Sequence, residues 1–71
     1  MSKNILTTRE QEVFSLLVKN YTTKNIADKL FISEKTVRNH ISNVMQKLEV
    51  ESRTSAVIEL IKLGEIEIEN D

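Results

Sequence analysis

Apolar residues recur along the chain at the three- and four-residue spacings of amphipathic helices, in four separate blocks. The helices predicted from these blocks span residues 8–18, 23–30, 34–48 and 53–63. Each block follows a residue whose side chain can cap a helix, and the expected N-caps are Thr7, Thr22, Ser33 and Ser52. Proline is absent and Gly64 is the only glycine, which disfavours the hairpin turns of a β fold. The pattern predicts one all-α domain over residues 1–71.

The predicted helix over residues 34–48 has two chemically different faces. Its apolar residues fall within an arc of about 100°, and they are Val37, Ile41, Val44, Met45 and Leu48. The opposite side carries Lys35, Asn39, Ser42, Asn43 and Gln46, with Arg38 on one shoulder and Thr36, His40 and Lys47 towards the other. No acid occurs from residue 35 to residue 48. A face that only meets solvent usually mixes acids with bases, because such pairs stabilise a helix. Amide, hydroxyl and guanidinium groups can instead hydrogen-bond to base edges in the DNA major groove.

The distribution of charge supports a polyanionic partner, although the net charge of the whole chain is −1. Residues 19–47 carry six bases and two acids, a net charge of +4, whereas residues 48–71 carry two bases and seven acids, a net charge of −5. Two bases balance two acids in residues 1–18. The basic middle of the chain therefore contains the helix that lacks acids.

Several classes of protein are disfavoured by what the sequence lacks. Cysteine is absent and His40 is the only histidine, so no metal site, cofactor or catalytic residue is predicted and an enzyme is the weakest hypothesis. No apolar run approaches the roughly 18 residues of a membrane span. We expect no membrane partner and a cytoplasmic protein. Met1 and the tail after Gly64 favour a complete small protein over a domain cut from a larger one.

The short helix over residues 23–30, a break of three residues and the longer helix over residues 34–48 together predict a helix-turn-helix. In such a unit the first helix crosses the DNA backbone and the second enters the major groove. Many helix-turn-helix proteins have glycine in the turn, but this chain has Phe31. A positive φ is uncommon for a bulky residue, so we expect the break to take another form.

Three stretches, "LTTREQEVFSLL", "TTKNIADKLFISEKTVRNHISNVMQKLEV" and "SRTSAV", cover nearly all of residues 6–57 and resemble the DNA-binding domain of LuxR-type (NarL/FixJ) transcription regulators. The resemblance implies a four-helix bundle with a central helix-turn-helix and a dimer interface on the fourth helix. It extends to a small stand-alone spore-coat regulator of the family, which implies a link to sporulation. Double-stranded DNA is the implied partner, and RNA polymerase is a second expected partner.

The resemblance also implies roles for individual residues. Base contacts fall on Arg38, Asn39 and Ser42. Phosphate contacts fall on Thr23, Lys24, Lys35, Thr36, His40 and Lys47. For His40, a packing role at the domain edge is an equal alternative. Arg53 lies at the start of a helix, where the dipole disfavours a positive charge, so we expect it to pair with Glu10 or Glu12.

The fourth predicted helix has more apolar residues than one face can bury. A symmetric dimer through Val57, Ile58 and Ile61 would cover them. We expect such a dimer because one helix-turn-helix reads too few base pairs for good specificity. The alternative is a protein-interaction module that binds a partner through the exposed aliphatics Ile58, Ile61, Ile66 and Ile68. The tail "EIEIEND" alternates acids with isoleucines, and an edge strand, a helix extension and a frayed end all fit it.

Overall fold

The computed structural model describes residues 5–67 of the chain, and four helices occur in this range. The helices are α1 (Thr8–Leu17), α2 (Thr23–Leu30), α3 (Glu34–Leu48) and α4 (Arg53–Lys62). Each begins at the predicted residue and ends within one residue of the predicted end. No strand is present among the described residues. The prediction of an all-α fold is therefore confirmed.

All four helices begin with the side-chain cap that the sequence predicts. The hydroxyl oxygens of Thr7, Thr22, Ser33 and Ser52 each accept a hydrogen bond, at 3.0–3.1 Å, from the backbone amide three residues later. At α1 the carboxylate of Glu10 also accepts from the amide of Thr7, which completes a capping box. Each cap satisfies an amide that would otherwise lack a partner and stabilises its helix by about 1 kcal/mol.

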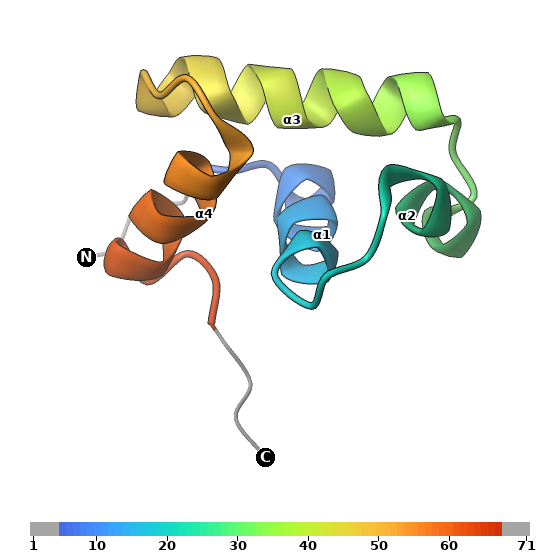
Figure 1. Ribbon diagram of the computed structural model, residues 1–71, viewed down its shortest axis with the longest axis horizontal. Helices are drawn as coiled ribbons and strands as arrows, with labels where there is room; N and C mark the ends of the chain where they lie inside the picture. The colour runs from blue at the N-terminus through green and yellow to red at the C-terminus, as the bar shows by residue number, and fades with distance from the viewer. Residues whose placement is uncertain (1–4, 68–71) are drawn as a thin grey trace.

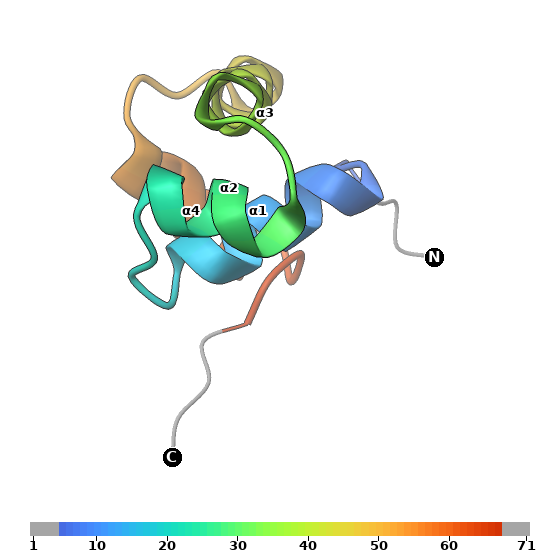
Figure 2. The same cartoon turned by 90° about the vertical axis from the view of Figure 1, so that its right-hand side faces the viewer.

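The helix α3 lies along one side of the molecule, and α1, α2 and α4 lie beneath it (Figure 1). A view nearly along α3 shows the other three helices on one side of its axis (Figure 2). The core draws residues from every helix, and its members are Leu6, Val13, Phe14, Leu16, Ile26, Ala27, Val37, Ile41, Val44, Ala56, Leu60 and Ile66. The predicted apolar face of α3 is confirmed, since Val37 and Val44 are fully buried. Because α3 buries one face only, its opposite face stays in solvent.

The helix ends share a hydrogen bond that the sequence did not predict. After each helix the backbone turns through a left-handed residue, namely Asn20, Phe31, Glu49 and Gly64. The amide of the next residue then donates to a carbonyl five residues earlier, from Tyr21, Ile32, Val50 and Glu65 respectively, at 2.9–3.1 Å. This bond satisfies a carbonyl at the helix end that has no partner within the helix. Gly64, with a φ of 76°, is the one glycine among these four residues.

The expectation that Phe31 would avoid a positive φ is wrong, because its φ is 59° and its ψ is 43°. The left-handed turn lets Ile32 donate to the carbonyl of Ala27 at 3.0 Å and pack against the core. These interactions outweigh the cost of about 1–2 kcal/mol for a left-handed residue other than glycine. The side chain of Phe31 adds little to the fold, since it is 93% exposed.

The segment after α4 folds back onto α1. Ile66 is buried in the core, and the side-chain amide of Gln11 donates to the carbonyl of Glu65 at 2.8 Å. Of the three forms that fit the alternating tail, residues 65–67 adopt none, because they form a bend that is packed against the core. The predicted exposure of Ile66 is therefore wrong, and Ile68 lies outside the described residues.

Candidate nucleic-acid interface

Six polar side chains form the solvent side of α3, and we refer to them as the polar face of α3. They are Lys35, Arg38, Asn39, Ser42, Asn43 and Gln46, and all six are exposed. The three predicted base-contacting residues belong to this set. A helix of 15 residues is about 22 Å long and fits a major groove about 12 Å wide. The polar face can thus present guanidinium, amide, hydroxyl and ammonium groups together to one stretch of groove.

One acid lies beside the polar face, at the first position of α3. The carboxylate of Glu34 is 3.6 Å from the guanidinium of Arg38, one turn later. Both side chains are about half exposed, so water screens the attraction and the pair contributes little to stability. The guanidinium of Arg38 therefore remains available to an acceptor that binds it more strongly than Glu34 does.

The two half-buried residues at the margin of α3 differ from the polar face. The hydroxyl of Thr36 lies 2.9 Å from that of Ser33, and its amide donates to the same oxygen. Thr36 therefore forms part of the cap of α3. His40 is half-buried one turn further along. The predicted phosphate contacts of both residues stay predictions.

The amino end of α2 provides a second polar site. Thr22 caps the helix through the amide of Asn25, Thr23 is half-buried, and Lys24 is exposed. The first amides of a helix have no partner within it, and the helix dipole adds a partial positive charge there. Such a helix end is suited to binding a phosphate oxygen, and Lys24 adds a full charge to it.

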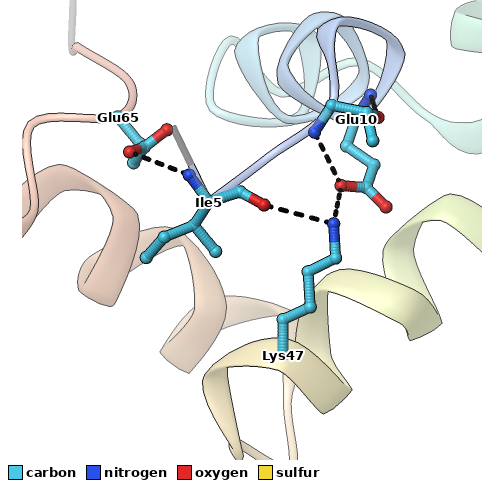
Figure 3. Close-up of polar contacts among 5 residues, drawn as sticks. Ile5, Glu10, Lys47 and Glu65 are labelled. Carbon is cyan, nitrogen blue, oxygen red and sulfur yellow. Dashed lines mark hydrogen bonds and ion pairs between the residues drawn. The ribbon is translucent and has the colours of Figure 1, made fainter. Parts of the chain in front are cut away.

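Lys47, a predicted phosphate contact, is exposed, but its ammonium group has protein partners. Its Nζ atom lies 2.5 Å from Oε1 of the buried Glu10 and donates to the carbonyl of Ile5 at 3.2 Å (Figure 3). The same carboxylate oxygen accepts from the amide of Thr7. Burial raises the pKa of Glu10. The hydrogen bonds from Lys47 and Thr7 and the charges of Lys47 and His40 lower it by more, so the pKa lies below its ordinary value.

This pair also corrects the expectation for Arg53. Glu10 binds Lys47, and Glu12 binds Arg9 at 3.2 Å, so neither carboxylate pairs with Arg53. Arg53 is exposed beside a shallow hollow lined by Leu17, Val18, Thr54 and Val57. A charge at the start of a helix needs no ion pair when water solvates it.

The residues expected at a dimer interface differ in exposure, since Val57 and Ile61 pack partly against the core and Ile58 does not. Ile58 is 49% exposed, and Val57 and Ile61 are half-buried. Leu63, just after the helix, is 48% exposed. Ala56 and Leu60 are fully buried, so the inner side of α4 already belongs to the core. The outer side is an apolar surface that a second chain could cover.

The described part of the chain contains neither a metal-ligand cluster nor a membrane-spanning helix. Residues 5–67 contain no group of three or more His, Cys, Asp or Glu side chains that could hold a metal ion. None of the helices in the same range is long and apolar enough to cross a membrane.

The sequence is similar to one family of proteins and to individual relatives. The sequence matches the family described as "Bacterial regulatory proteins, luxR family" over residues 4–60. It is 66% identical over 67 residues to the spore germination protein GerE of Bacillus subtilis (strain 168), a match that covers 94% of this chain and 90% of GerE. It is 49% identical over 65 residues to the transcriptional regulatory protein DegU of Brevibacillus brevis, which covers 92% of this chain but 28% of DegU.

The fold is similar to that of a solved structure described as the transcription factor GerE. The TM-score is 0.92 at 55% sequence identity, and the match covers 94% of this chain and 100% of that chain. The sequence and the fold therefore agree on one relationship, and the polar face of α3 has the chemistry that this relationship requires. The chain belongs to the luxR family of bacterial regulatory proteins, and it is a DNA-binding transcription regulator whose helix-turn-helix is formed by α2 and α3.

Proposed function

We propose that the chain acts as a single domain that dimerises and binds a two-fold-related DNA site through the polar face of α3. The observation that carries the proposal is the absence of acids from residue 35 to residue 48 on an exposed helix face. A carboxylate in the groove would be repelled by the phosphates, except where it accepts from cytosine. Two copies of α3 would enter successive major grooves about 34 Å apart.

Base contacts in this proposal come from the middle of the polar face. Arg38 can donate two hydrogen bonds to O6 and N7 of guanine, and Asn39 can pair with N6 and N7 of adenine. Ser42 is one turn beyond Arg38, on the same exposed side. Arg38 and Asn39 lie in the first half of α3, which fits the way in which recognition helices present their amino-terminal residues to bases.

Phosphate contacts would hold α3 in register without reading sequence. Lys24 and Thr23 at the amino end of α2, together with Lys35 on α3, are the strongest of the proposed contacts, because Lys24 and Lys35 are exposed cations. Thr36 and His40 are half-buried, so any phosphate contact from them would come from the edge of the domain.

Dimerisation would use Val57, Ile58 and Ile61 on α4. A second copy could place its Ile58 in the shallow hollow formed by Leu17, Val18 and Val57. This arrangement would remove from water the apolar surface that α4 leaves exposed. The acids between residues 49 and 67 would then lie beside the dimer interface and not on the DNA.

The biological setting follows from the relatives. GerE, with 66% identity, is described as a spore germination protein, and this supports a regulatory role in sporulation or germination. The proposed place of action is the cytoplasm, on promoter DNA, and RNA polymerase is the proposed protein partner there.

Selection of binding sites from random double-stranded DNA tests this proposal. We expect a two-fold-related motif whose halves are about 10 base pairs apart, and binding that weakens steeply with salt. Failure to recover any motif would favour the alternative, a module that binds another protein through α4. The burial of Ile66 removes one of the four aliphatics on which that alternative depended.

A further inference from the structure

The carboxylate of Glu10 joins the start of α1 to a residue of α3 that is 37 positions away in sequence. Its Oε1 atom accepts from the amide of Thr7 at the start of α1 and from Nζ of Lys47 in the last turn of α3. Lys47 also donates to the carbonyl of Ile5, in the segment before α1 (Figure 3). Ile5 in turn donates its amide to the carboxylate of Glu65 at 3.4 Å. We refer to Glu10, Lys47 and the carbonyl of Ile5 as the Glu10–Lys47 clamp.

Burial distinguishes the Glu10–Lys47 clamp from the other ion pairs in the described range. The side chain of Glu10 is 5% exposed and that of Lys47 is 36% exposed, whereas the pairs Arg9–Glu12 and Arg38–Glu34 lie at 43% to 55%. Glu10 is the only charged residue buried between residues 5 and 67. A buried carboxylate needs its partners, because without them its desolvation is uncompensated. Lys47 is therefore bound to Glu10 at the clamp, although its own side chain is 36% exposed.

The clamp holds the carboxyl-terminal end of α3, so it can affect the position of the polar face of α3. Lys47 is eight residues from Asn39, a separation of about 12 Å along the helix axis. A tilt of α3 by about 10° around its carboxyl-terminal end would move Asn39 by about 2 Å. Hydrogen bonds to base edges tolerate only a few tenths of an ångström. Contacts at the far end of α3 thus affect the residues that read bases.

We propose that Lys47 and Glu10 are positioning residues that set the angle of the recognition helix on DNA, and that Lys47 does not contact phosphate. This inference rests on the proposed function, since it assumes that the polar face of α3 reads bases. It replaces the phosphate contact expected for Lys47. Residues outside the DNA interface would then contribute to its affinity and specificity.

Glu10→Gln distinguishes a positioning role of Lys47 from a phosphate contact. The two roles predict different changes in the affinity for operator DNA. The amide oxygen of glutamine can still cap α1, but the charge that holds Lys47 is lost. If the clamp positions α3, operator binding weakens by about tenfold, which corresponds to about 1.4 kcal/mol. If Lys47 binds phosphate, its release from Glu10 leaves affinity unchanged or raises it. Glu12→Gln is the matched control, because it removes an exposed carboxylate from the same helix, and it should leave binding unchanged.

Lys47→Gln provides a second test that leaves the capping box intact. We expect weaker operator binding with an unchanged dependence of log K on log salt. Loss of a phosphate contact would instead reduce the magnitude of that slope by about 0.9 for each protomer. Lys35→Gln, at a proposed phosphate contact, should show that reduction and serves as the positive control. Circular dichroism at the binding temperature confirms that each variant is folded before it is compared.

The double variant completes the experiment. Glu10→Gln and Lys47→Gln together should weaken operator binding by no more than the stronger single variant, because both remove the same interaction. Additive losses of operator affinity in the double variant would overturn the positioning role, and so would a changed slope of log K against log salt in Lys47→Gln. In either case the wild-type protein would still bind its operator, so the proposed function would stand. A wild-type protein that shows no sequence-specific binding would overturn the proposed function, and the inference with it.

Discussion

The guanidinium of Arg38 lies 3.6 Å from the carboxylate of Glu34, one turn earlier on the exposed side of α3. Glu34 is well placed for the fold, because a negative charge at the first position of a helix interacts favourably with the dipole. The distance and the exposure of both side chains make the ion pair weak. A guanine edge offers Arg38 two acceptors with better geometry, so binding to DNA should replace this partner.

Replacement of Arg38 by alanine should therefore alter recognition without altering folding. We expect discrimination at one base pair to fall by about 1–3 kcal/mol. The free energy of unfolding should change by less than about 0.5 kcal/mol, because only an exposed ion pair is lost. Titrations against operators with single base-pair changes measure the first quantity, and urea unfolding measures the second.

Asn43→Ala is the matched control for Arg38→Ala, since Asn43 lies on the polar face of α3 but is not a proposed base contact. It should leave the preference at every base pair unchanged. If Arg38→Ala lowered affinity equally for all sequences, Arg38 would contact phosphate and not a base.

The sequence predicted the helix starts because the signals for them are local. Thr7, Thr22, Ser33 and Ser52 each bind an amide only three residues away, so a short window contains the whole interaction. The polar and apolar faces of α3 were predicted for the same reason, since a helix repeats over 3.6 residues.

The errors concern interactions that depend on the assembled fold. The pairing expected between Arg53 and Glu10 was wrong because Glu10 binds Lys47, which is 37 residues away, so no local pattern pointed to it. The burial of Ile66 depends on α1 lying beside the segment after α4. Phe31 is different, because the local residue type pointed the other way. A left-handed helix end usually has Gly or Asn at this position, and the packing of Ile32 on the core that favours the turn is visible only in the assembled fold.

Phe31→Gly should stabilise the protein. Glycine adopts a positive φ without strain, and the ring of Phe31 is almost fully exposed, so little packing is lost. We expect the free energy of unfolding to rise by about 1 kcal/mol, after allowance for the greater freedom of glycine in the unfolded chain. Urea unfolding measures the change. Phe31→Ala keeps the strained backbone and should have no such effect, and equal stabilisation by both variants would exclude backbone strain as the cause.

Ile58→Glu should prevent dimerisation while the monomer remains folded. Ile58 is 49% exposed, and glutamate is a good helix former, so the free energy of unfolding should change by less than about 0.5 kcal/mol. In a symmetric dimer the new charges would face each other or lie in an apolar interface, where they are costly. Sedimentation analysis measures the oligomeric state, and titration against whole and half operators measures the loss of paired binding.

Leu63→Glu is the control for Ile58→Glu, because Leu63 is 48% exposed at the end of the same helix and is not a proposed interface residue. It should leave the oligomeric state unchanged. A dimer that tolerates Ile58→Glu would exclude this surface of α4 from the interface.

The pH dependence of stability should reveal the state of Glu10. Although its burial raises the pKa, Lys47, the amide of Thr7 and the charge of His40 hold the folded-state pKa below the unfolded value. Since the folded state favours the ionised carboxyl, its contribution is complete above the unfolded pKa and is lost as the pH falls through the folded pKa. The wild-type protein should exceed Glu10→Gln in free energy of unfolding by about 1–2 kcal/mol at pH 7. This difference in free energy of unfolding should shrink below about pH 5 in urea titrations. A difference that grew with acidity would contradict the prediction. It would mean that burial dominates and that Glu10 is protonated more readily in the folded state.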